Sequence, residues 1–102
     1  MVKHPKYQAQ DVGRMQEIPR AFERYYPESF TLEKVEPEKG LPPPGPIPRP
    51  TFRVLDEDGE LVAYYHPYGN AECYRKDLQE IHGRMLRAIE RAGIEAMKEF
   101  ET

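Results

Sequence analysis

One cysteine and two histidines in the second half of the chain are the side chains best suited to covalent chemistry. Cys73 follows His66 by seven residues and precedes His82 by nine. A helix predicted to begin near residue 71 would place Cys73 in its first turn, where a thiolate is stabilised. A histidine beside a thiol is the minimum for nucleophilic catalysis. Since no Ser, Asn or Asp is placed to orient such a pair, we predict no catalytic residue, and a thiol-dependent enzyme using Cys73 is the least favoured alternative.

The same three side chains, together with His4, are the candidate ligands of a metal ion. Their spacing matches none of the compact ligand pairs of structural zinc sites, and the chain has no CxxC, HxxxH or HExxH pattern. Asp56, Asp58 and Glu60 suggest a calcium loop, but proline-rich chain and a predicted strand stand where an EF-hand has helices. These carboxylates therefore indicate a turn. We predict no metal site and no cofactor.

Tyrosines and basic residues gather in the middle of the sequence. They are Tyr64, Tyr65, Tyr68, Tyr74, Arg53, Arg75 and Lys76. Such residues stack single-stranded bases, are enriched in the hot spots of protein interfaces, or simply pack within a domain. A net charge of −3 opposes nucleic acid, because attraction to the phosphates supplies most non-specific affinity. We predict local packing or a protein interface, with the four tyrosines and Arg53 as candidate contacts.

Proline dominates residues 37–50, where it occupies seven of fourteen positions. No helix or central strand forms in such a segment, and an extended polyproline II arm is expected. The PxxPxR pattern of many ligands of proline-reading domains is absent, which favours a spacer or a surface-bound arm. The candidate partner contacts in this arm are Pro43, Pro44, Pro46, Ile47 and Arg49.

Turn residues and the spacing of apolar residues predict the short helices and the strands. Residues 8–16 and a second segment opened by Pro19 predict two short helices, the second ended by Pro27. Residues 29–35 carry a weak strand signal. Residues 51–55 and 60–65 flank a turn in which Gly59 can supply a positive φ, and this pattern predicts a β-hairpin.

A long amphipathic helix is predicted over residues 71–100, with Asn70 as its N-cap. Its apolar face comprises Ala71, Tyr74, Leu78, Ile81, Met85, Leu86, Ala88, Ile89, Ala92, Ala96, Met97 and Phe100. At about 45 Å the helix exceeds the diameter of a compact chain of this size, so it breaks near Gly83 or Gly93 or projects. Met97 and Phe100 near its end are therefore further candidates for contact with a partner.

These elements predict an α+β fold in which a β-hairpin packs against the long C-terminal helix. Three strands, the third drawn from residues 30–35, are the alternative to a two-stranded hairpin. Residues 1–50 are expected to form an N-terminal arm with short helices and an extended proline-rich segment. Residues 51–102 hold the hairpin and the helix, and the whole chain is one small domain.

Composition restricts the compartment and the class of protein. Hydrophobic residues make up 38%, no apolar run is long enough to span a membrane, and the first residues lack the apolar stretch of a secretory signal. The single cysteine cannot form an internal disulfide, which indicates a reducing, cytoplasmic setting. Eleven prolines, many charges and few amides are typical of a thermophile protein.

The predicted function is non-enzymatic. Because the chain is poor in core residues and carries an extended arm, we expect a small structural or accessory subunit that binds and staples larger protein partners. A virion component and an accessory subunit of an enzyme complex both fit. The alternative is a free-standing regulator or inhibitor that binds one protein through its tyrosines. No membrane contact is expected.

Overall fold

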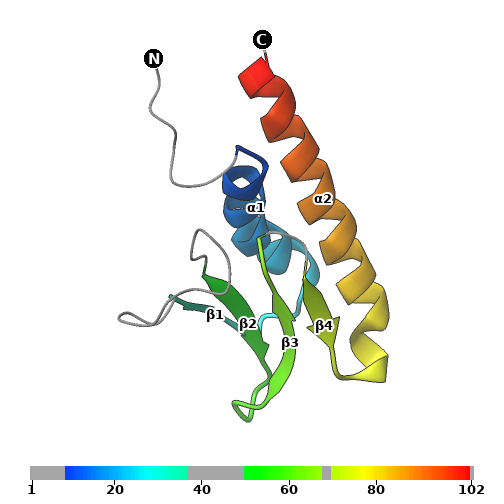
Figure 1. Cartoon of the computed structure of the whole chain (residues 1–102). Coiled ribbons are helices and arrows are strands. Elements are labelled where there is room, and N and C mark those ends of the chain that lie inside the picture. The colour runs from blue at the N-terminus through cyan, green and yellow to red at the C-terminus, as the bar shows by residue number, and fades with distance from the viewer. Residues whose placement is uncertain (1–8, 37–49, 68–69, 102) are drawn as a thin grey trace.

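Within residues 9–36, 50–67 and 70–101, which the computed structural model describes, the chain forms two α-helices, four strands and one 3₁₀ turn (Figure 1). The first helix, α1 (Ala9–Tyr25), is continuous where the sequence predicted two short helices. Pro19 lies inside it on the exposed side, while Ile18 and Ala21 are fully buried. Packing of these neighbours holds the helix together despite the hydrogen bond that proline removes. The helix ends just before Pro27, as predicted.

Four strands form one antiparallel sheet in the order β1 (Thr31–Val35), β2 (Thr51–Leu55), β3 (Leu61–Tyr65) and β4 (Ala71–Cys73). The hairpin of β2 and β3 confirms the prediction, and Gly59 in its turn has a φ of 80°. β1 confirms the weak strand signal. It pairs with β2 along its whole length, so the sheet has a third strand from the N-terminal half of the chain.

Strand β4 replaces the start of the predicted helix. Ala71 and Cys73 pair with Tyr65 and Ala63 of β3, and the amide of His66 donates to the carbonyl of Asn70. Asn70 therefore precedes a strand and is not a helix cap. The three residues alternate between apolar and charged, a pattern that fits a strand as well as one turn of a helix. They form a strand because the unpaired edge of β3 provides partners for their backbone hydrogen bonds.

The C-terminal helix begins later than predicted and does not break. A 3₁₀ turn, η1 (Lys76–Leu78), leads into α2 (Gln79–Glu101), which runs through both Gly83 and Gly93. The predicted apolar face is largely correct, since Leu78, Met85 and Ile89 are buried. Two residues of the predicted face are exposed to solvent, Leu86 by 38% and Met97 by 40%, so the buried face is narrower than predicted.

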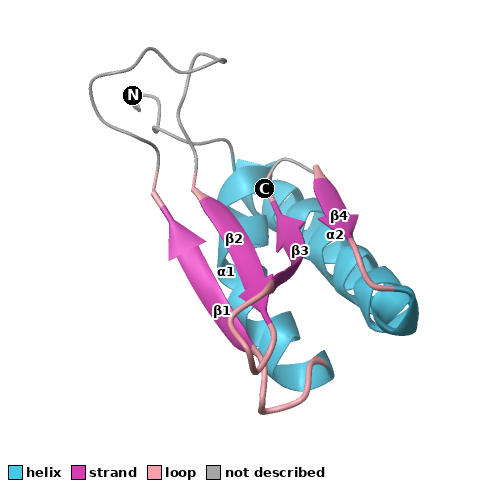
Figure 2. Cartoon of the chain, turned by 90° about the horizontal axis from the view of Figure 1, so that it is seen from below, coloured by secondary structure: helices cyan, strands magenta, loops and turns pink. Residues whose placement is uncertain are grey.

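The molecule has two layers, with both helices on one side of the sheet (Figure 2). The core lies between the layers and consists of Ile18, Ala21, Tyr26, Phe52, Val54, Val62, Ala63, Tyr65, Leu78, Met85, Ala88 and Ile89. Because Ile18 and Ala21 are among these residues, α1 belongs to the same core as the hairpin. Full burial of a large apolar side chain contributes about 1.5–3 kcal/mol.

The two helices run antiparallel and come very close near the start of α1. A Cβ atom on Gly13 would lie 2.7 Å from both the carbonyl oxygen of Ala92 and the Cβ of Ala96. Only glycine fits there, because the opposing atoms are backbone and a short side chain. This contact fixes the separation of the two helices and the width of the surface between them.

The fold is α+β, as predicted, with a four-stranded antiparallel sheet and a long C-terminal helix. The predicted proline-rich arm lies outside the described residues, apart from Pro50, which is buried.

Candidate protein-binding face of the sheet

The sheet has one face that no described element covers. Side chains of a strand alternate between faces, and Phe52 and Val54 of β2 are buried under the helices, so Arg53 between them points to the other face. Register places Glu33 of β1 and Tyr64 of β3 on either side of Arg53, and Glu72 of β4 beside Tyr64. These residues, with Tyr74 and His66, whose rings lie beside that of Tyr64, define the open face. It belongs to the side of the sheet that faces away from the two helices (Figure 2).

An ion pair and a group of rings organise the open face. The guanidinium of Arg53 lies 3.4 Å from the carboxylate of Glu33, and its buried Nε has no hydrogen-bond acceptor among the described residues. The ring of Tyr64 lies between two other rings, 6.4 Å from that of Tyr74 and 5.6 Å from that of His66. The face is therefore aromatic at its centre and charged at both sides.

The polar groups around these rings are hydrogen-bonded. His66 Nδ1 lies 3.2 Å from the hydroxyl of Thr51, and partial burial lowers the pKa of this histidine, which favours the neutral ring. The pKa of the Tyr74 hydroxyl is raised, by desolvation first and then by its hydrogen bond to Glu72. Tyr74 is nevertheless 55% exposed, so most of its ring faces solvent.

Three of the predicted contacts, Tyr64, Tyr74 and Arg53, meet on the open face. Tyr65 does not, because its side chain is fully buried on the opposite side of β3, as the alternation of strand residues requires. Met97 is partly exposed on α2, in the helix layer. The remaining candidates lie outside the described residues or have side chains outside them: Tyr68, Pro43, Pro44, Pro46, Ile47, Arg49 and Phe100.

Sequence reasoning missed two members of the open face. From the sequence, His66 is a candidate base or metal ligand, and Glu72 falls within the predicted helix over residues 71–100. A signal for His66 is present in the sequence, because it directly follows the predicted strand over residues 60–65. If the chain stays extended by one more residue, His66 shares a face with Tyr64, two residues earlier. No comparable signal exists for Glu72, since its place follows from the pairing of β4 with β3.

Tyr65 forms the middle of a buried hydrogen-bond chain. Its hydroxyl lies 2.9 Å from that of Tyr26 and 2.9 Å from Nδ1 of His82. Burial raises the pKa of both tyrosines and lowers that of His82, so all three side chains are neutral at pH 7. Polar groups so deep in a core are stable only when hydrogen-bonded, and this chain provides those bonds.

Cys73 does not lie at a helix N-terminus, because it is the last residue of β4. Its thiol is half-buried and donates to the carbonyl of Arg75 at 3.3 Å. His82 is hydrogen-bonded to Tyr65 and His66 contacts Thr51, so neither forms a described hydrogen bond with the thiol. The geometry that the sequence predicted for a thiolate is therefore absent from the described part of the chain.

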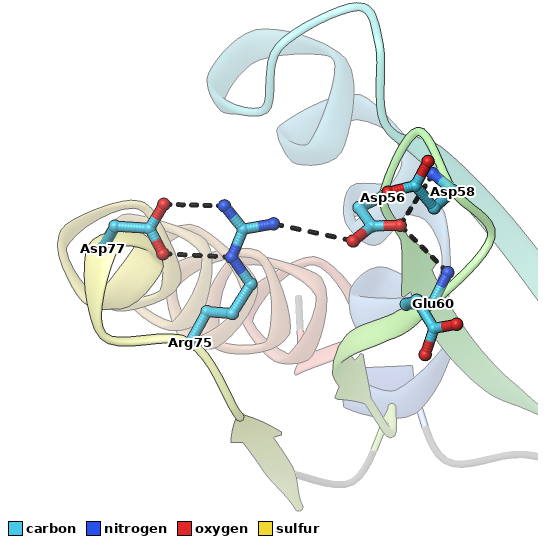
Figure 3. A network of polar contacts seen from close by, with 5 residues as sticks. All are labelled: Asp56, Asp58, Glu60, Arg75 and Asp77. Carbon is cyan, nitrogen blue, oxygen red and sulfur yellow. Dashed lines mark hydrogen bonds and ion pairs between the residues drawn. The ribbon is translucent and has the colours of Figure 1, made fainter.

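The acidic turn between β2 and β3 is stabilised by the carboxylate of Asp56 (Figure 3). Oδ1 of Asp56 accepts the amides of Asp58 and Glu60, each at 2.9 Å. Arg75 lies 3.7 Å from the same carboxylate and forms two hydrogen bonds with Asp77, which lower the pKa of Asp77. This network ties the turn to η1. In the described residues no cluster of three or more His, Cys, Asp or Glu could hold a metal ion.

Comparison with known proteins gives no relative, since no family model, curated protein or solved structure matches the chain. Among the helices that are described, none is long and apolar enough to cross a membrane.

Proposed function

We propose that the chain is a non-enzymatic subunit that binds a larger protein through the open face of its sheet. The observation that carries the proposal is that Tyr64, Tyr74 and Arg53 lie together where no described element covers them. Tyrosine and arginine are the residues in which binding energy most often concentrates at protein interfaces. A ring such as Tyr74 offers a large contact area and loses little side-chain entropy on binding.

Charge favours protein over nucleic acid as the partner. Glu33 and Glu72 flank the aromatic centre, and the whole chain has a net charge of −3. Phosphates approaching the rings would meet both carboxylates. A protein surface with its own basic rim would be attracted by them.

The partner and the role of the rings can be tested together. We would capture the partner from the source cells with tagged wild-type chain, identify it by mass spectrometry, and measure its affinity for purified variants by calorimetry. Tyr64→Ser/Tyr74→Ser is expected to weaken binding by about 30-fold or more, because hot-spot side chains contribute about 2 kcal/mol or more. Ile94→Ser, which removes an exposed apolar side chain from α2, is the matched control and should bind like wild type.

Equal affinity of the double tyrosine variant and the wild type would contradict the proposal. Cys73→Ser is expected to keep the wild-type affinity, because its thiol lies off the open face. A chemical activity of the chain that this substitution abolished, without change in fold, would instead establish the thiol-enzyme alternative.

A free-standing regulator is the second candidate, because an exposed aromatic patch on one chain suits it as well. The two candidates differ in the complexes that they form. A subunit co-purifies with its partner at fixed stoichiometry through gel filtration, whereas a regulator is recovered largely as the free chain.

A further inference from the structure

A groove runs between α1 and α2 on the outer side of the helix layer. On α1, Arg20 is two residues from the buried Ile18, and on α2, Arg87 is two residues from the buried Met85. Two residues correspond to about 200° around a helix, so both arginines point away from the core. Three adjoining hollows of about 390, 310 and 250 Å³ follow one another between the helices.

Arginine is the dominant side chain of this groove. The charged residues that line the hollows are Arg20, Arg24, Arg84, Arg87, Arg91, Glu17, Glu80 and Glu95. Five arginines and three glutamates give the groove a formal charge of +2, in a chain whose net charge is −3. The groove is therefore positive although the chain as a whole is negative.

Internal ion pairs neutralise only part of this charge. Arg24 lies 3.5 Å from Glu17, and Arg84 lies 3.2 Å from Glu80. Arg20, Arg87 and Arg91 are exposed and form no ion pair with the described residues. Arg91 and Glu95 are four residues apart on α2 but do not form an ion pair. Three guanidinium groups thus remain available to an external anion.

We propose that this arginine groove binds a short acidic segment of another protein, a run of Asp or Glu residues. Arg84, Arg87 and Arg91 share one face of α2 and span about 10 Å along its axis, at 1.5 Å per residue. An extended peptide advances about 3.3 Å per residue, so the same length holds three or four residues. Each guanidinium presents paired donors that match a carboxylate.

The ends of the groove favour a short anion over a long one. Glu80 and Glu95 stand beyond the arginines on α2, one in each of the two outer hollows. A nucleic acid strand would have to carry its phosphates past both carboxylates and over an acidic protein. A short acidic peptide fits between them, along Arg84, Arg87 and Arg91. This site lies opposite the open face and is independent of the function proposed for that face.

The experiment measures binding of a short fluorescein-labelled polyglutamate peptide to the full chain by fluorescence anisotropy at low salt. Arg87→Gln/Arg91→Gln removes two unpaired guanidinium groups and is expected to weaken binding by about tenfold or more. Lys34→Gln/Lys76→Gln removes the same charge from exposed lysines outside the groove and should change affinity by less than about twofold. Circular dichroism checks that both variants keep their helices.

Three results would overturn the proposal. The first is that the wild-type chain does not bind the peptide. The second is that both double variants lose affinity equally, which would show an effect of net charge and not of the groove. The third is that single-stranded oligothymidylate of equal length binds more tightly than polyglutamate, which would assign the groove to nucleic acid.

Discussion

The hydroxyl of Tyr65 joins two buried polar side chains, Tyr26 and His82, that form no other hydrogen bond within the described residues. Buried polar groups without a partner each cost about 1–3 kcal/mol. The chain of three side chains therefore connects the end of α1, the centre of the sheet and α2 through polar bonds as well as apolar packing. A change at its centre affects all three elements.

Removal of this hydroxyl tests the role of the buried chain. Tyr65→Phe is expected to lower the free energy of unfolding by about 2–3 kcal/mol, because Tyr26 and His82 lose their shared partner. Tyr25→Phe, whose hydroxyl forms no hydrogen bond with the described residues, should change it by less than about 0.5 kcal/mol. Urea unfolding with unchanged m-values measures both. Equal effects of the two substitutions would show that the hydrogen bonds contribute nothing specific.

The buried histidine makes stability depend on pH. Burial lowers the pKa of His82 in the folded protein below its ordinary value of 6.5, and His66 shifts in the same direction. The stabilisation is therefore complete above about pH 6.5 and is lost as pH falls through the folded pKa values, because the unfolded chain binds protons first. We expect the unfolding free energy to fall between about pH 7 and about pH 5, before most carboxylates titrate.

The variant His66→Gln/His82→Gln carries no titrating group at these positions. Its unfolding free energy is expected to be nearly constant over the same pH range, although lower than that of the wild type at neutral pH. If the double variant retained the full pH dependence, carboxylates and not the histidines would be its source.

At the scale of elements, the close contact of α1 and α2 at Gly13 determines how the helix layer is built. Gly13→Ala is expected to destabilise the protein by about 1–3 kcal/mol, because its new methyl group would overlap with backbone and Cβ atoms of α2. Gly83→Ala is the matched control. Its nearest neighbour is a flexible arginine nitrogen at 3.7 Å, so the better helix propensity of alanine should stabilise by about 0.5–1 kcal/mol. Thermal unfolding measures whether each substitution raises or lowers stability. If Gly13→Ala stabilised the protein, the close packing of α1 and α2 at this position would be contradicted.

The elements that the sequence predicted correctly are those whose signals are local. Turn chemistry at Gly59 and alternating apolar residues were sufficient for the β2–β3 hairpin. The spacing of Met85, Ala88 and Ile89 was sufficient for the buried face of α2. These features depend on neighbours in the chain alone. The α+β class followed from them.

The elements that the sequence missed depend on contacts between distant residues. Pro19 predicts the start of a helix, yet α1 continues through it because Ile18 and Ala21 pack in the core. Residues 71–73 were predicted to begin the long helix. They form a strand because they pair with the unpaired edge of β3, a contact between segments that the spacing of residues does not reveal. On the open face, Tyr64, Tyr74 and Arg53 could be predicted from their residue types. Glu72 could not, because its position depends on how β4 pairs with β3.

The two binding surfaces that we propose lie on opposite sides of one layered fold. The open face is aromatic with carboxylates at its sides, and the groove between the helices is rich in arginine. A chain that binds one protein on each side would join them, which is how a small subunit with a modest core can hold an assembly together. The stapling role expected from the sequence would then come from the two faces of the folded part.

Hydroxyl-radical footprinting of the chain, alone and in complex with the protein captured from its source cells, tests the central claim most directly. This method reports the solvent exposure of individual side chains, and Tyr74 is the most exposed large apolar or aromatic side chain of the described residues, at 55%. The account predicts that oxidation of Tyr74 falls several-fold in the complex, because the partner covers the open face, while oxidation of Ile94 on α2 stays unchanged. Equal oxidation of Tyr74 in the free and the bound chain would contradict it.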